Sequence, residues 1–159
     1  MKALILAALA AIAIQIPLFG ILNLPPMIIG GAGIDGGDIA FYVTAIVIVA
    51  TSTVLLVGLP GFALLQRFGR VSMSATALAG LAIGAVPILV LSWPMHGLYG
   101  GYSSSGDWFG HTVDFYKNGG PTFHAWLDYA LNVLKLGIQG AVGAAAFYWV
   151  WRRIAARQA

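Results

Sequence analysis

The sequence predicts an all-α integral membrane protein, a bundle of four transmembrane helices with both termini in the cytoplasm. Of its 159 residues 60% are hydrophobic and only 8% are charged, whereas a soluble domain carries about 25% charged residues. Four apolar stretches each reach the roughly 20 residues that a helix needs to cross a bilayer. Most of the basic residues fall at the chain ends and in one short turn, all on one side of such a bundle. We therefore expect one membrane domain spanning residues 1–159.

The four predicted spans differ in how they begin and end. We expect an uncleaved first span, because its apolar run is longer than that of a signal peptide, and it stops at Pro25 and Pro26. The second is rich in β-branched residues, yet only a helix satisfies its own backbone in lipid. Pro60 and Gly61 predict a kink or an early end of that helix. The spans cover residues 3–24, 39–65, 71–93 and 123–151.

Three connections join these spans. The first outer loop, 25–38, contains the run GGAGIDGGD, which matches no phosphate-binding pattern and is typical of a linker. The inner turn, 66–70, is short and basic. The second outer loop, 94–122, is the only sizeable polar segment, and its middle, 107–117, is expected to form a short interfacial helix.

The distribution of charge predicts the orientation. Cytoplasmic connections of membrane proteins carry an excess of Lys and Arg, so both termini and the turn 66–70 are expected inside and the two longer loops outside. A formal net charge of +3, bound to helix ends, gives no reason to expect nucleic acid as a partner. The basic residues on the inner side are Lys2, Arg67, Arg70, Arg152, Arg153 and Arg157; Lys117 falls outside.

One segment resembles a pattern found in small membrane proteins. The run LPGFALLQRFGRVSMSATALAGLAIGA is similar to the helix, basic turn and Gly-rich helix of many small bacterial inner-membrane proteins. The resemblance covers about a sixth of the chain. It implies a location in the bacterial inner membrane and no particular activity.

The fourth span carries one line of polar side chains on an otherwise apolar helix. At about 100° per residue these side chains fall within a narrow arc, and Lys135 and Gln139 would lie within the hydrocarbon. Ionisable groups at that depth are costly and are candidates for function by default. Lys135 either extends outward as a satisfied packing residue or lines a polar cavity. The line consists of His124, Asp128, Asn132, Lys135 and Gln139.

Polar groups on four helices are predicted to share one depth. At 1.5 Å per residue, Gln15, Thr53 and Gln139 lie at about 20 Å from the inner ends of their spans. Pro87 removes the usual donor to the Ile83 carbonyl at the same level. We expect these groups to form an interhelical hydrogen-bonded layer.

The third span contains Gly80 and Gly84 in a GxxxG arrangement. Small residues at this spacing let two helices approach closely, here more readily within the chain than between chains.

The outer loop offers Asp107, His111 and Asp114 at positions i, i+4 and i+7. On a helix these residues would share a face and could hold a metal such as zinc. No HExxH or CxxC motif accompanies them, and the chain lacks cysteine and glutamate. We expect no metal, no cofactor and no enzymatic activity, since no catalytic constellation is recognisable.

The expected function is that of a non-catalytic accessory subunit or binding component of a larger membrane assembly. Its partners would be the lipid bilayer and either another membrane protein or a second copy of the chain. Two alternatives stay open: an immunity-type protein that neutralises a toxin within the membrane, and a small transporter or channel lined by the Asp128–Asn132–Lys135–Gln139 face.

Overall fold

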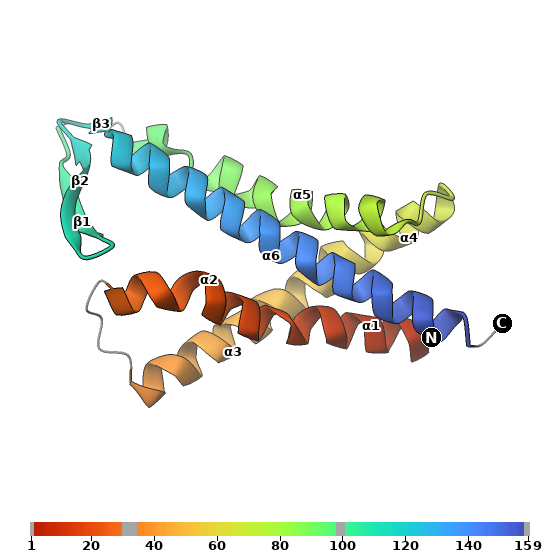
Figure 1. Cartoon of the computed structure of the whole chain (residues 1–159). Coiled ribbons are helices and arrows are strands. Elements are labelled where there is room, and N and C mark those ends of the chain that lie inside the picture. The colour runs from red at the N-terminus through yellow and green to blue at the C-terminus, as the bar shows by residue number, and fades with distance from the viewer. Residues whose placement is uncertain (1, 30–34, 98–100, 158–159) are drawn as a thin grey trace.

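The computed structural model describes residues 2–29, 35–97 and 101–157. Within these residues, four helical stretches are long and apolar enough to cross a membrane: Lys2–Pro25, Gly36–Arg67, Met73–Leu91 and Phe123–Ala155. The expected bundle of four long apolar helices is therefore present (Figure 1). In chain order the elements are α1 (Lys2–Ala13), α2 (Gln15–Ile29), α3 (Gly36–Thr53), the π-helical turn Val54–Gly58, α4 (Leu59–Arg67), α5 (Met73–Leu91), a 3-10 turn (Pro94–Gly97), β1 (Ser104–Trp108), β2 (His111–Lys117), β3 (Gly120–Pro121) and α6 (Phe123–Ala155).

The expectation of a purely helical fold is wrong in the second outer loop. Residues 107–117, expected to form an interfacial helix, belong instead to an antiparallel sheet with strand order β1-β2-β3. Two-residue turns join the strands, and both have positive φ at both central positions: 53° and 82° at Phe109 and Gly110, 51° and 82° at Asn118 and Gly119. This geometry is that of type I′ turns, whose twist matches that of paired strands.

The first long helix is interrupted by Pro17. The ring lacks an N–H group, so the helix breaks at Ile14 and separates α1 from α2. By contrast, Pro25 and Pro26 do not end the helix as expected, because α2 continues to Ile29. The expected linker after it lies partly outside the described residues. Asp35 and Asp38 beyond it form a capping box that begins α3 at Gly36.

The second long helix contains a π-helical turn, Val54–Gly58, directly before Pro60. In this turn the Leu59 N–H donates to the Val54 carbonyl, five residues back. Thr53 and Phe62 are nine residues apart, which would place them on roughly opposite faces of a regular α-helix at about 100° per residue. The wider turn absorbs one residue, so both side chains line the same central cavity.

Helices α5 and α6 approach so closely that no side chain fits between them at two points. A Cβ added to Gly80 would collide with the Gly140 carbonyl, and one added to Gly84 would collide with the Leu136 carbonyl. The GxxxG pair thus packs within the chain, against small residues of α6. At the far end of this pair, the Tyr129 hydroxyl donates to the Leu89 carbonyl over 2.9 Å and caps the last turn of α5.

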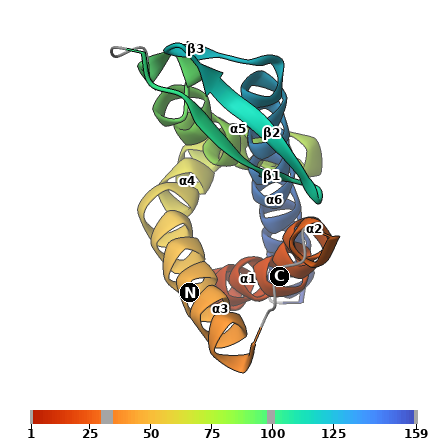
Figure 2. The ribbon, with the colours of Figure 1, turned by 90° about the vertical axis from the view of Figure 1, so that its left-hand side faces the viewer.

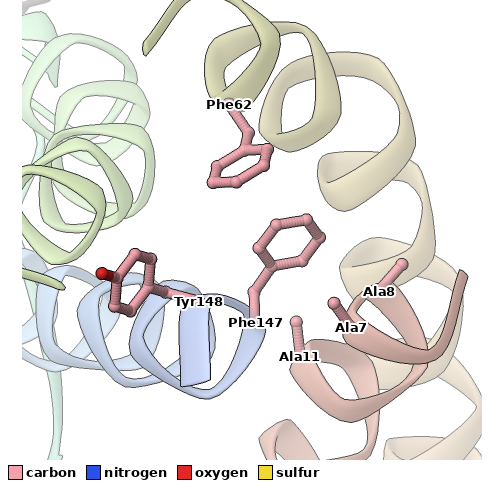
Figure 3. Close-up of a cluster of buried hydrophobic side chains, with 6 residues drawn as sticks. All are labelled: Ala7, Ala8, Ala11, Phe62, Phe147 and Tyr148. Carbon is pink, nitrogen blue, oxygen red and sulfur yellow. The ribbon is translucent and has the colours of Figure 1, made fainter. Parts of the chain in front are cut away.

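Helix α1 packs against a different side of α6 through alanines. Ala7 is fully buried, and Ala8 and Ala11 are nearly so. Together with Phe62, Phe147 and Tyr148 they form the hydrophobic core cluster (Figure 3). The Phe62 and Phe147 rings meet edge to face with centroids 4.8 Å apart. Tyr148 is buried in this cluster although it lies near the basic end of α6.

The two ends of the molecule differ in character (Figure 1). At one end lie the start of α1, the end of α4 and the end of α6, which carry Lys2, Arg67, Arg152 and Arg153. We call it the basic end. At the other, which we call the sheet end, the strands cover the start of α6 and reach α2 (Figure 2).

Replacing Gly80 by alanine is expected to destabilise the protein by about 1–3 kcal/mol, because the new Cβ collides with backbone that cannot move without separating α5 from α6. Gly20→Ala is the matched control, since its Cβ meets only Leu24 at an ordinary 3.7 Å. Thermal unfolding of both variants in the same detergent measures the difference. Equal midpoints would contradict the close approach.

Candidate functional site

Most of the polar line on α6 faces a cavity at the sheet end. This sheet-end cavity has a volume of about 530 Å³, within the range typical of small-molecule sites. Four of the five predicted residues line it: Asp128, Asn132, Lys135 and Gln139. The other lining residues come from α2, from α5 and the segment after it, from the sheet and from α6 itself: Phe19, Asn23, Ile88, Ser92, Pro94, Ser104, Phe115, Tyr116, Ala125, Tyr129 and Leu136.

The sheet lines one side of this cavity, which we call its roof. The β1–β2 register shifts between Ser104 and Ser105, which pair with Tyr116 and Asp114, so Phe115 is an extra residue on β2. Such a bulge re-aims side chains, and here both Phe115 and Tyr116 line the cavity. The Tyr116 hydroxyl donates to the Pro94 carbonyl over 3.2 Å, which ties the roof to the segment after α5.

The roof also reaches across to α2. A Cβ added to Gly110, in the β1–β2 turn, would lie 3.2 Å from the Ile29 carbonyl oxygen. The turn itself is fixed by the Asp107 carboxylate, which accepts the Gly110 N–H over 3.1 Å. The sheet therefore extends from the start of α6 to the end of α2 (Figure 2).

Two opposite charges line the sheet-end cavity at different depths. The Asn132 amide donates to Asp128 Oδ2 over 3.0 Å, a bond between successive turns of α6 that orients the carboxylate. Lys135 lies seven residues further along the helix, or about 10 Å along the axis. Both charged side chains are half-buried and line the same space. The cavity is thus lined by an acidic residue nearer the sheet and by a basic residue about two turns further along α6.

His124 stands apart from the other four residues of the predicted line. Its ring packs edge to face on Trp108 of β1, with centroids 5.4 Å apart. It does not line the cavity. The sheet covers the first turn of α6, and its Trp108 packs on His124. Helical periodicity within α6 cannot predict this contact.

A second cavity of about 380 Å³ lies between the helices, further from the sheet. We call it the central cavity. Its lining is largely apolar and comes from all six α-helices, including Val49, Phe62, Ile83 and Phe147. The two cavities share Phe19, Leu136 and Gln139, so they adjoin along α6.

Of the predicted polar layer, the structure shows one interhelical hydrogen bond, which lies at this junction. The Gln15 side-chain amide donates to the Gln139 backbone carbonyl over 3.2 Å and to the Ala11 carbonyl over 3.3 Å. The bond thus joins α1–α2 to α6 through backbone rather than through two side chains. Thr53 and Ile83 line the central cavity but take no part in this bond.

Aromatic side chains pack beside the central cavity. Phe62 and Phe147 line it and belong to the core cluster. The Phe62 ring also meets Trp151 edge to face with centroids 5.1 Å apart. The view in Figure 3 shows Phe62 and Phe147 facing each other, with the α1 alanines beside them.

The outer-loop candidates do not form the helical face expected of them. In the sheet, Asp114 pairs with Ser105 and Asp107 pairs with Thr112, on the exposed side, while His111 pairs with Trp108. The Ser105 hydroxyl donates to Asp114 Oδ1 over 2.6 Å, and Asp107 holds the turn. Among the described residues, no group of three His, Cys, Asp or Glu side chains could hold a metal ion.

Three contributors to the site were not expected from the sequence. Tyr116 can be assigned to the site only if the hairpin is predicted. The Asn118-Gly119 pair indicates that hairpin, because Asn-Gly is the strongest short-range signal for a type I′ turn. Phe19 and Asn23 lie within the predicted first span, but nothing in the sequence places them beside the polar line of α6. No local pattern marks Asn23, whose side chain donates to the Phe19 carbonyl over 3.2 Å.

Comparisons with protein-family models, with curated proteins and with solved structures gave no match. The case for the site rests on its geometry.

The sheet-end cavity predicts a difference in solvent access between neighbouring positions of α6. The chain has no cysteine, so a single introduced cysteine is the only thiol that a maleimide can label. We expect Asn132→Cys to react with a charged maleimide roughly tenfold faster than Leu134→Cys, because the reactive thiolate forms only where water reaches it. Leu134 lies on the outward face and is 58% exposed to the surroundings of the bundle, which detergent covers. Equal rates in the same micelles would show that the cavity is not open to water.

Proposed function

We propose that the protein is a non-catalytic binding component of a membrane, with its ligand in the sheet-end cavity. The observation that carries the proposal is the convergence of Asp128, Asn132 and Lys135 on α6 with Tyr116 of the sheet around one space. Charged groups halfway along such an apolar helix are costly in lipid. A ligand that pairs with both charges would offset that free-energy cost.

The distribution of charge supports the proposed orientation. The basic end would lie in the cytoplasm, as the positive-inside rule favours, and the sheet would lie on the outer side. Arg153 stacks on Trp149 with its guanidinium 3.7 Å from the ring centroid, an arrangement suited to the boundary between lipid and water. The proposed location is the bacterial inner membrane.

The aromatic packing beside the central cavity supports binding over conduction. A channel or transporter needs a path to the opposite side, and we propose that the Phe62–Phe147 pair, whose ring centroids are 4.8 Å apart, obstructs such a path. The half-buried Lys135 side chain would present a fixed charge to a resident ligand rather than line a continuous pore.

As a second candidate we propose the role of accessory subunit in a larger membrane assembly. The observation that favours it is α3, which contributes no buried residue to the chain's own core. Large side chains such as Phe41 and Ile48 point outward and are 70% and 60% exposed. A helix of another membrane protein would complete this side. Isolation of the chain from its native membrane at the mass of a monomer, under mild detergent, would speak against a stable partner.

The proposed orientation predicts which ends of the chain are accessible from outside. Lys117→Cys, on the sheet, should react with an impermeant maleimide in intact spheroplasts. Arg157→Cys, at the basic end, should react only after lysis. Both positions are exposed, so burial does not explain a difference. The reverse pattern would overturn the orientation.

The binding function is tested by what the purified protein retains. Native mass spectrometry of the protein, extracted in polymer-bounded discs, should show a bound small molecule on the wild type. Lys135→Leu should lose it, with about a tenfold or greater fall in occupancy, since truncating one member of a charged contact costs 2–5 kcal/mol. Lys117→Leu is the matched control because it removes an exposed lysine of the sheet outside the cavity.

Flux through liposomes separates binding from transport. The wild type should pass no more ion or solute than empty liposomes do. Flux that Lys135→Leu abolishes and Lys117→Leu preserves would contradict the binding role and support transport.

A further inference from the structure

We propose that the ligand is an aminophospholipid, a lipid whose headgroup carries a phosphate and a primary ammonium. The inference rests on the proposed binding function and specifies its ligand. The headgroup would lie in the sheet-end cavity, with its phosphate at Lys135 and its ammonium at Asp128. One acyl chain would follow α6 into the central cavity.

The charges of the sheet-end cavity match a zwitterion rather than a simple anion. Asp128 and Lys135 line the same space, so an anionic headgroup would meet a carboxylate as well as an ammonium. A phosphate and an ammonium joined by a two-carbon bridge satisfy both. One Asp128 oxygen accepts from Asn132; within residues 2–29, 35–97 and 101–157 the other has no hydrogen-bond donor, so it can accept from a primary ammonium.

The order of the two charges along α6 matches the order within a lipid. In a phospholipid the phosphate lies nearer the acyl chains and the ammonium nearer the water. Lys135 lies about 10 Å deeper than Asp128 along the helix axis, and helical side chains tilt toward the helix N-terminus. The lysine therefore extends toward the carboxylate from below. With the sheet end outside, this is the orientation of a lipid in the outer leaflet.

The acyl chain is accommodated by the adjoining cavity. The central cavity begins where the sheet-end cavity ends, at Phe19, Leu136 and Gln139. Two of its polar side chains are engaged with backbone: Gln15 with Gln139, and Thr76 with the Ser72 carbonyl over 2.8 Å. The surface that remains for a ligand is mostly apolar, and a hydrocarbon chain covers such a surface whereas a soluble zwitterion does not.

The access route lies along α3. This helix has no buried residue, yet its Tyr42, Ile46 and Val49 line the central cavity. Figure 2 shows α3 on the opposite side of the bundle from α5. A lipid could exchange sideways between the cavity and the bilayer past this helix, without passing under the sheet.

The test uses discs of defined lipid composition and the full-length protein. Discs contain phosphatidylethanolamine, phosphatidylglycerol or phosphatidylcholine, and native mass spectrometry counts the lipids retained after release from the disc. The wild type should retain phosphatidylethanolamine at least about tenfold better than phosphatidylglycerol, which lacks the ammonium. It should also discriminate against phosphatidylcholine, whose quaternary ammonium cannot donate a hydrogen bond to Asp128.

Two substitutions separate the headgroup contacts. Asp128→Asn keeps the shape of the side chain and should remove the preference for phosphatidylethanolamine over phosphatidylglycerol. Lys135→Leu should lose both lipids. Lys117→Leu should behave as the wild type, and thermal unfolding of each variant shows that it is folded. Retention of phosphatidylethanolamine by Asp128→Asn with its selectivity unchanged would overturn the assignment of the ammonium.

A third measurement distinguishes lipid from soluble ligand. Glycerophosphoethanolamine carries the headgroup without chains and should compete weakly, because it leaves the central cavity uncovered. Competition as strong as that of the lipid would overturn the role of that cavity. A retained non-lipid molecule that Lys135→Leu loses would overturn the aminophospholipid and leave the binding function standing. No retained molecule in any preparation would overturn both.

Discussion

The close approach of α5 and α6 is the constraint on which the rest of the structure depends. At Gly80 and Gly84 the backbone of α5 lies directly against the carbonyls of Gly140 and Leu136, with no room for a methyl group. The alanines of α1 bring a third helix against α6 in a similar way. Helix α6 thus becomes the axis of the bundle. Because two of its sides are occupied by close neighbours, its polar residues face the remaining space, and that space is where both cavities lie.

The helical part of the fold follows directly from composition. Length and apolar content predict four long helices, and the structure has them. The predicted ends of the helices are less accurate where a proline is expected to end the helix. Pro25 and Pro26 lie within α2, since a proline removes one donor and leaves the rest of the helix able to form. Pro60 acts differently, through the wide turn before it.

The sheet could not be inferred from helical periodicity, although its signals are in the sequence. Asn118-Gly119 is a strong turn signal, whereas Phe109-Gly110 is not, because a phenylalanine at φ 53° is unusual. Asp107 and its hydrogen bond to Gly110 help to hold that turn. The polar line was predictable because it depends only on positions within α6. The separation of His124 from it was not, because Trp108 reaches His124 from the sheet.

The π-helical turn at Val54–Gly58 determines where the chain can lose a residue without disturbing the bundle. The turn holds one residue more than a regular helix needs, and α3 and α4 each keep their own phase toward the central cavity on either side of it. A relative lacking one residue here could form an unbroken α-helix with Thr53 and the equivalent of Phe62 still facing inward. The same deletion within α5 would rotate Gly80 away from Gly140. Length changes along the bundle are therefore expected to concentrate in this one segment.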